Sequence, residues 1–245
     1  MPGGSTNVYD DEARARAYAE LGFPGTYYLA FRDLPSVFER HVVGTRALDF
    51  GCGTGRSTRF LRDLGFSAIG VDISAPMLRE ARRLDPGGDY LLVSESEPGY
   101  LPSGPFDLVL STFTFDNMPD LRQREVSLRS LVRLLGPRGR IVSVVSSPEI
   151  YVNEWASFST RDYPANRGAA SGDRVLIVML DVEDARPVED VVCSDEDYSE
   201  LFLRTGLVVL ETLRPLATGR EPVEWVSETE TAPWVIYVLG KGRSE

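Results

Sequence analysis

The amino-acid sequence predicts an α/β fold built on a doubly wound, mostly parallel sheet, and three features of the chain support this prediction. Short apolar segments alternate five times with helix-type segments between residues 47 and 145. A glycine-rich turn, GCGTG at 51–55, joins the first apolar segment to a helix. The last two apolar segments, 207–213 and 234–239, have no helix between them. The alternation predicts parallel strands with right-handed crossovers, and the last pair predicts antiparallel strands at one edge.

The strands of the parallel part are predicted where apolar runs end at turn residues. They are Ala47–Phe50, Ala68–Val71, Tyr90–Val93, Phe106–Ser111 and Arg140–Val145. The fourth run shows no polar alternation, which is typical of a strand buried on both faces. The connecting helices are predicted at Ser57–Leu64, Pro76–Leu84 and Leu121–Leu135, the second of them with Ser74 as its N-cap.

Further elements are predicted on both sides of this alternating part. Two helices precede it, one at Glu12–Glu20 capped by Asp10 or Asp11, and one at Tyr27–Arg40 that is interrupted near Pro35. After residue 146 the pattern has no clear period until two strand-like runs, Arg174–Leu180 and Val188–Cys193. A helix at Asp195–Thr205, with Gly206 as its C-cap, then leads to the final strand pair.

These elements predict four parts of one chain around a seven-stranded sheet, with the last strand antiparallel and helices on both faces. We expect an N-terminal helical lid at 1–40 and a ligand-binding core at 41–147. A substrate lid or insertion with a hairpin is expected at 148–194. Residues 195–245 are expected to form the C-terminal helix and the antiparallel strand pair that completes the sheet.

Composition excludes several classes of function. The formal net charge of −11 opposes binding to nucleic acid, and the arginines form no dense basic block. No apolar run approaches the roughly 20 residues that span a bilayer, and the N-terminus lacks the features of a signal peptide. Cys52 and Cys193 lie in no metal-binding spacing, so no metal site is predicted. We expect a cytoplasmic monomer or homodimer that contacts neither nucleic acid nor membrane and acts on a small molecule.

The glycine turn and the acid that follows it predict a nucleoside-containing ligand. Gly51, Gly53 and Gly55 follow a strand and open a helix, which is the context in which such a turn binds a ligand. Glycines tolerate positive φ and let a ligand approach the backbone. Asp72 ends the next strand, where a carboxylate can accept hydrogen bonds from both ribose hydroxyls. The spacing is not the G-x-G-x-x-G of dinucleotide sites, which counts against a nicotinamide-dependent oxidoreductase.

Four segments in this order resemble the class I S-adenosylmethionine-dependent methyltransferases that act on small molecules. They are DFGCGTG at 49–55, GVDIS at 70–74, FDLV at 106–109 and LLGPRGR at 134–140. The resemblance covers nearly the whole chain and implies a Rossmann-like fold. It implies S-adenosyl-L-methionine as the cofactor and S-adenosyl-L-homocysteine as the product.

The resemblance also implies roles for the matched residues. Gly51 and Gly53, with Cys52 between them, would pack against the methionine part of the cofactor, and Asp49 would orient its amino group. Asp72 would hold the ribose. The remaining residues implied on the cofactor side are Ile73 and Met77 beside the adenine, Ser94 and Glu95 near the adenine amine, Ser111 and Thr112 near the sulfonium, and Tyr28 and Arg32 from the N-terminal helices. Arg32 would meet the cofactor carboxylate or pair with Asp33.

The predicted reaction is in-line methyl transfer to a nitrogen or oxygen atom of a small metabolite or natural-product intermediate. Asp116, Tyr151 and Glu154 are the candidate catalytic residues, because carboxylates and phenols after the fourth and fifth strands can act as bases. A proximity mechanism without a dedicated base stays open. Aromatic residues of the two lid regions could wall the acceptor site or pack in the core; they are Tyr27, Tyr28, Tyr151, Trp155 and Phe158. The alternative function is non-methylating chemistry with the same cofactor, such as a cyclisation or rearrangement.

Overall fold

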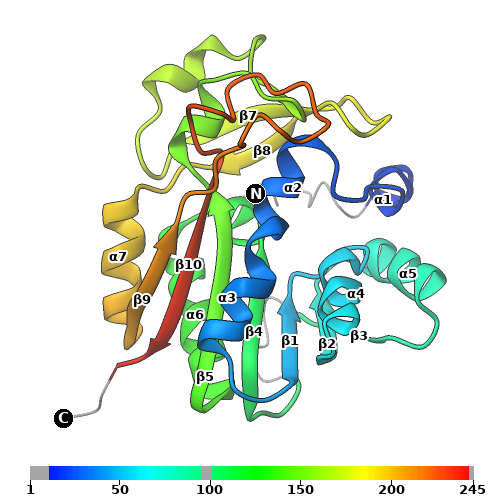
Figure 1. Ribbon diagram of the computed structural model, residues 1–245, viewed down its shortest axis with the longest axis vertical. Coiled ribbons are helices and arrows are strands. Elements are labelled where there is room, and N and C mark those ends of the chain that lie inside the picture. The colour runs from blue at the N-terminus through cyan, green and yellow to red at the C-terminus, as the bar shows by residue number, and fades with distance from the viewer. Residues whose placement is uncertain (1–10, 95–100, 243–245) are drawn as a thin grey trace, which may run out of the picture.

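The computed structural model describes residues 11–94 and 101–242, and its centre is a seven-stranded sheet in the order β3-β2-β1-β4-β5-β10-β9 (Figure 1). Its strands are β1 (Arg46–Phe50), β2 (Ser67–Asp72), β3 (Asp89–Leu92), β4 (Phe106–Thr112), β5 (Leu135–Ser146), β9 (Leu207–Leu213) and β10 (Trp234–Lys241). β1 to β5 are parallel, whereas β10 is antiparallel to both β5 and β9. The predicted doubly wound sheet with an antiparallel last strand is thereby confirmed.

Helices cover both faces of this sheet. They are α1 (Glu12–Ala19), α2 (Gly25–Arg32), α3 (Leu34–His41), α4 (Arg56–Asp63), α5 (Ala75–Leu84), α6 (Leu121–Leu134) and α7 (Asp195–Arg204). One core cluster joins α2 and α3 to residues such as Leu108 and Val142 on one sheet face. Another joins α6 and α7 to Val109 and Ile141 on the opposite face. Alternate residues of β4 and β5 therefore serve two cores, as a strand buried on both faces requires.

Two element boundaries differ from the sequence prediction. The helix expected at 27–40 is broken at Asp33, and Pro35 lies in the first turn of α3 rather than at the interruption. Proline fits a first turn because the N–H it lacks would have no partner within the helix. β5 begins at Leu135, before the glycines of the LLGPRGR segment, instead of at Arg140.

The segment after β5 forms a small second sheet. Its three strands have the order β6-β7-β8, with β6 at Phe158–Ser159, β7 at Arg174–Met179 and β8 at Val188–Val191. β7 and β8 pair antiparallel, as the predicted hairpin requires. Short 3-10 turns accompany it, namely η3 (Phe115–Asn117) after β4, η4 (Pro148–Tyr151) and η5 (Pro164–Gly168). Figure 1 shows β7 and β8 beyond the carboxyl ends of the parallel strands, at the same end as α1 and α2.

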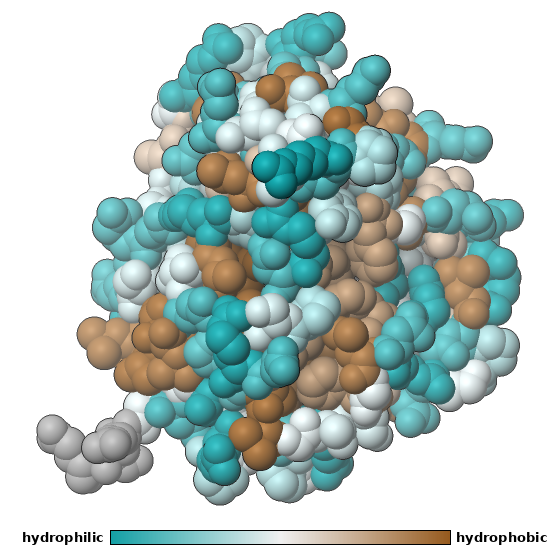
Figure 2. Space-filling model, viewed as in Figure 1, coloured by the Kyte–Doolittle hydropathy of each residue, from teal (hydrophilic) through white to brown (hydrophobic). Residues whose placement is uncertain are grey.

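β9 is an edge strand of the seven-stranded sheet. Among the described residues it pairs with β10 alone, and its residues Val208, Val209 and Leu210 are exposed. Figure 2 shows apolar residues gathered on the side of the molecule where β9 and α7 lie. Within 11–94 and 101–242, no helix has the length and apolar character needed to cross a membrane.

Candidate functional site

A cavity of about 400 Å³ opens at the carboxyl ends of β1, β2 and β4. Its wall combines the glycine turn, the segment after β2, the segment after β4 with one face of α6, and the β7–β8 hairpin. Tyr18 and Leu21, at the end of α1 and just after it, complete the wall on the N-terminal side. Ligands of open α/β sheets bind at this edge, where neighbouring loops diverge.

The glycine turn presents bare backbone to this cavity. Gly51 and Gly53 both line it, with φ of +76° and +54°. A Cβ added to Gly51 would lie 2.1 Å from the side-chain oxygen of Thr114, so glycine is required there for packing. A Cβ added to Gly53 would meet no atom within 4 Å, because that position faces open space. Gly53 therefore leaves room for a ligand against the backbone.

Asp72 lines the cavity beside this turn and holds it in place. One carboxylate oxygen accepts a 2.7 Å hydrogen bond from the N–H of Gly53, and the other accepts a 2.8 Å bond from the N–H of Ser74. Each carboxylate oxygen has further lone pairs. The sequence prediction that Asp72 lies at the ligand edge, next to the glycine turn, agrees with this position.

Asp49, which is expected to orient the amino group of the cofactor, does not line the cavity. It is fully buried behind the turn, where one oxygen accepts bonds from the hydroxyls of Ser57 at 2.7 Å and Thr58 at 2.6 Å. Its other oxygen, Oδ1, has no donor among the described residues. Burial raises the pKa of Asp49 to about 6. Its link to the cavity runs through Ser57, which lines the wall.

Arg56 is a charged residue of the cavity wall that the sequence did not predict. Its half-buried guanidinium lines the cavity at the start of α4 and donates a 2.6 Å hydrogen bond to the carbonyl of Gly22. It lies 4.7 Å from the ring centre of Tyr27 and 5.5 Å from that of Phe31. No carboxylate in the described part of the chain forms an ion pair with it, and desolvation lowers its pKa. A desolvated cation without an ion-pair partner favours an anionic ligand group.

Arg32 and Tyr28 are not at the cavity, which corrects their predicted cofactor contacts. Arg32 forms a bidentate ion pair with Asp33, with both N–O distances 2.9 Å, and donates a hydrogen bond to the carbonyl of Leu216. These partners hold its guanidinium away from the glycine turn. Tyr28 is 37% exposed and belongs to the outer side of α2. Of the two alternatives for Arg32, pairing with Asp33 is the one that the structure contains.

The residues predicted beside the adenine and the sulfonium mostly line the cavity. Those that do are Cys52, Ile73, Met77, Ser94 and Thr112. Ser111 is fully buried and is not part of the wall, because alternate residues of β4 point to opposite faces. Phe113 and Thr114, which follow Thr112, take its place. Glu95 lies outside the described residues.

None of the three candidate catalytic residues lines the cavity. The buried Asp116 accepts a 3.0 Å hydrogen bond from the N–H of Ser146. The phenol of Tyr151 is buried and donates to Asp190 at 3.1 Å. Glu154 accepts bonds from Ser159 and Thr160 at the surface of the insertion. All three side chains therefore hydrogen-bond to other parts of the protein. Asn117, the neighbour of Asp116, does line the cavity.

The aromatic residues proposed as an acceptor wall divide in the same way. Tyr27, Tyr151, Trp155 and Phe158 are buried in the core cluster that covers one face of the sheet. The rings on the wall are instead Tyr18, Phe50 and Phe113. Periodicity identifies buried rings, but it does not say whether a ring faces the core or a cavity.

Two buried carboxylates beside the cavity make stability depend on pH. Burial and the charge of Asp190 raise the pKa of Asp116 to about 7, and burial raises that of Asp190 to about 6. Because the folded state holds these protons more tightly than the unfolded state, this pair contributes less stability as the pH rises from about 4 to 7. We expect Asp116→Asn to raise the Tm more at pH 8 than at pH 5, measured by calorimetry. A difference from wild type that is equal at both pH values would contradict this.

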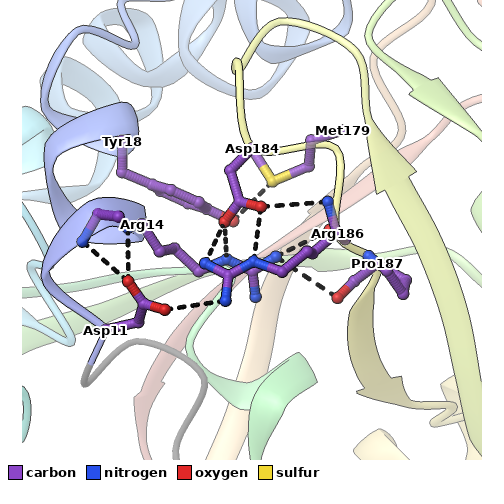
Figure 3. A network of polar contacts seen from close by, with 8 residues as sticks. Asp11, Arg14, Tyr18, Met179, Asp184, Arg186 and Pro187 are labelled. Atoms are coloured by element: carbon purple, nitrogen blue, oxygen red, sulfur yellow. Dashed lines mark hydrogen bonds and ion pairs between the residues drawn. The ribbon is translucent and has the colours of Figure 1, made fainter.

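A network of ion pairs joins α1 to the loop between β7 and β8 (Figure 3). Asp11 caps α1 with one oxygen and pairs with Arg186 through the other at 2.8 Å. Arg14, only 2% exposed, pairs with Asp184 at 2.8 Å and donates to the carbonyl of Arg186. One turn further, the hydroxyl of Tyr18 contacts the sulfur of Met179. We call this set the clasp, and it connects two segments that both contribute to the cavity wall.

Comparisons with known proteins point to one kind of domain. A family model described as a methyltransferase domain matches residues 48–143. The chain is 32% identical over 126 residues to a 2-methyl-6-phytyl-1,4-hydroquinone methyltransferase from Synechocystis sp., which covers 50% of this chain and 36% of the relative. It is 37% identical over 94 residues to a malonyl-(acyl-carrier protein) O-methyltransferase from Enterobacter lignolyticus, covering 38% and 36%. The chain thus spans about a third of the length of these two relatives.

Solved structures share the fold over almost the whole chain. The CcbJ methyltransferase from Streptomyces caelestis matches with a TM-score of 0.66 and 17% identity, over 96% of this chain and 98% of that one. DesVI from Streptomyces venezuelae matches with a TM-score of 0.62 and 18% identity, over 93% and 98%. At these identities the likeness establishes the common fold.

Proposed function

We propose that this chain is a class I S-adenosylmethionine-dependent methyltransferase, as the methyltransferase-domain match over residues 48–143 and the shared fold support, and that it transfers a methyl group to a nitrogen or oxygen atom of a small molecule. The observation that carries the proposal is the cavity beside the glycine turn, with Arg56 and Asp72 on its wall. These two charges suit two parts of S-adenosylmethionine, the carboxylate of its methionine part and the hydroxyls of its ribose.

The residues on the wall fit this cofactor group by group. Gly53 leaves open space over the backbone for the methionine part, and Arg56 offers its carboxylate a cation that forms no ion pair within the described residues. Asp72 offers the ribose hydroxyls a carboxylate. Ile73 and Met77 provide apolar contact for the adenine. Asp49 supports the turn from behind through Ser57.

S-adenosylmethionine, when bound, supplies a methyl group on a positively charged sulfur, and transfer to nitrogen or oxygen leaves S-adenosylhomocysteine and a proton. The protein then has to place the acceptor and exclude water. Thr112, the last residue of β4, and Phe113, which follows it, both lie on the wall of the cavity. Phe113 keeps a positive φ of 63°, a conformation that costs energy for a residue with a side chain and is held where a site needs it.

The proposal is tested by mass spectrometry with a cofactor that carries a deuterated methyl group. Purified protein is incubated with a panel of hydroxyl- and amine-bearing acceptors. We expect S-adenosylhomocysteine together with an acceptor whose mass increases by one labelled methyl group. Rearranged products that form without release of S-adenosylhomocysteine would instead favour non-methylating chemistry. The monomeric or homodimeric state and the cytoplasmic location stay predictions from the sequence.

We further propose that the N-terminal helix and the insertion hairpin close over the site and that the clasp holds them together. Replacing Asp184 by alanine leaves the buried Arg14 without its carboxylate. We expect S-adenosylhomocysteine to dissociate roughly five- to tenfold faster, which corresponds to ~1–1.4 kcal/mol. Surface plasmon resonance measures this rate. Glu125→Ala, which removes ion pairs with Arg129 on α6 and Arg204 on α7 away from the clasp, is the matched control. An Asp184 variant with the dissociation rate of wild type would contradict a lid.

A further inference from the structure

Asn117 is a polar side chain on the cavity wall to which the proposed function assigns no contact with the cofactor. It lies in η3, directly after the end of β4, and is exposed to the cavity. Its amide nitrogen donates a short hydrogen bond to Oδ1 of Asp190. The other oxygen of Asp190 accepts from the phenol of Tyr151 at 3.1 Å. Asn117 on the core is thus joined to β8 and η4 of the insertion.

This arrangement fixes the direction of the amide. An ionised carboxylate can only accept hydrogen bonds, so the nitrogen of Asn117 must face Asp190. The amide oxygen is then left for another partner, and no donor among the described residues is bonded to it. A carbonyl oxygen at this place suits a ligand that brings an N–H or O–H group.

The cost of the surrounding cluster argues against a purely structural role. Asp190 and Asp116 are 7% and 4% exposed, and each disfavours the charge of the other. Buried acids without full compensation destabilise a fold, and a neutral residue could anchor β8 at lower cost. Such clusters concentrate at functional sites. The charged and titratable groups that face Asp190 are Asp116, Arg124, Tyr151 and Glu189.

We propose that Asn117 binds the nucleophilic N–H or O–H group of the acceptor, and that Asp190, held by Tyr151, is a positioning residue that orients the Asn117 amide. This inference rests on the proposed function and narrows it to acceptors with a hydrogen-bond donor at the reacting atom. Val191, which follows Asp190 on β8, lines the cavity next to this position and supplies apolar contact. The acceptor site is thereby placed between η3 and β8.

Two probes of nearly equal shape test the role of Asn117. In protein saturated with S-adenosylhomocysteine, fluorine NMR measures the Kd of para-fluorophenol and of para-fluorotoluene, which has a methyl group in place of the hydroxyl. We expect Asn117→Ala to weaken fluorophenol binding about five- to tenfold, as the loss of one hydrogen bond predicts. Fluorotoluene binding should change less than about twofold. Asn153→Ala is the control, since Asn153 is bonded to the carbonyl of Glu149 and lies off the wall.

Asp190→Asn separates positioning from structure. Removing a buried charge should leave the Tm equal to or above that of wild type, whereas fluorophenol binding should weaken as in Asn117→Ala. In wild type, fluorophenol binding should weaken as the pH falls from 8 to 5, because a protonated Asp190 no longer requires the amide nitrogen to face it. This dependence should be lost in Asp190→Asn.

Three results would overturn the inference. They are equal fluorophenol affinity in wild type and Asn117→Ala, equal loss of both probes, and a wild type that shows no preference for fluorophenol over fluorotoluene. Calorimetric titration with S-adenosylhomocysteine distinguishes a failure of the proposed function from a failure of the Asn117 inference. Absence of that binding contradicts the proposed function, whereas loss of the Asn117 effect with that binding intact contradicts only this inference.

Discussion

Replacement of Arg56 by methionine is expected to weaken S-adenosylhomocysteine binding about a hundredfold. The side chain keeps its length and its contact with Tyr27 and Phe31, but it loses the cation on the cavity wall. A carboxylate brought to this desolvated place would then have no counter-charge, and charged hydrogen bonds are worth ~1.5–3 kcal/mol. Calorimetric titration measures the change. The Tm should fall only slightly, because Arg56 has no ion pair in the described part of the chain and loses one hydrogen bond, to the carbonyl of Gly22.

Arg59→Met is the matched control for this variant. Arg59 lies on the same helix and donates to the carbonyl of Thr54 at 2.8 Å, but it is absent from the wall. Its removal should alter affinity less than about threefold. If Arg56→Met binds S-adenosylhomocysteine as tightly as Arg59→Met, the carboxylate does not lie beside Arg56.

Replacement of Asp72 by alanine is expected to weaken cofactor binding tenfold or more. Its carboxylate is the acid on the wall beside the glycine turn, and loss of its charged hydrogen bonds to the ribose accounts for ~1.5–3 kcal/mol. Asp72 also accepts from the N–H groups of Gly53 and Ser74, so part of the loss comes from a looser turn. Calorimetric titration and the Tm are therefore measured together.

Asp72→Asn is a smaller change at the same position. An asparagine oxygen can still accept a hydrogen bond, but the side chain no longer offers two acceptor oxygens and a charge. Because the amide can accept from only one of the N–H groups of Gly53 and Ser74, we expect both the affinity and the Tm to lie between those of wild type and Asp72→Ala. Unchanged affinity in Asp72→Ala would refute the assignment of Asp72 to the ribose.

The sequence allows the relative positions of residues to be predicted where these residues are near one another in the chain. Gly51, Gly53 and Asp72 occur at the ends of two consecutive strands, and β1 pairs with β2 in register. The turn therefore meets the acid through local connections alone, and Asp72 bonds to Gly53 as a result. The same locality explains why a doubly wound parallel sheet could be predicted from the alternation of strands with helices.

Arg32 and Arg56 illustrate why the carboxylate partner could not be predicted. Both arginines lie on helices near the ligand edge, and the sequence gives no sign of which one has a carboxylate beside it. Asp33 is adjacent to Arg32 in the chain and takes its charge. Arg56 is surrounded by rings that come from the segment before β1. Only the packing of α2 against α4 creates that environment.

The catalytic candidates failed for a related reason. Asp116, Tyr151 and Glu154 were chosen because they follow β4 and β5, which end at the ligand edge. Whether such a side chain turns toward the cavity depends on partners from the insertion, such as Asp190, which bonds to Tyr151 across 39 positions of sequence. The clasp is likewise formed by residues far apart in the sequence, since Arg14 and Asp184 are separated by 170 positions. Contacts of this range have no local signal in the chain.

Calorimetric titration of the wild-type protein tests most directly whether the cavity beside the glycine turn binds S-adenosylmethionine. We expect saturable binding of S-adenosylhomocysteine to a single site, with no binding of NAD under the same conditions. Binding of NAD without binding of S-adenosylhomocysteine or S-adenosylmethionine would contradict the claim.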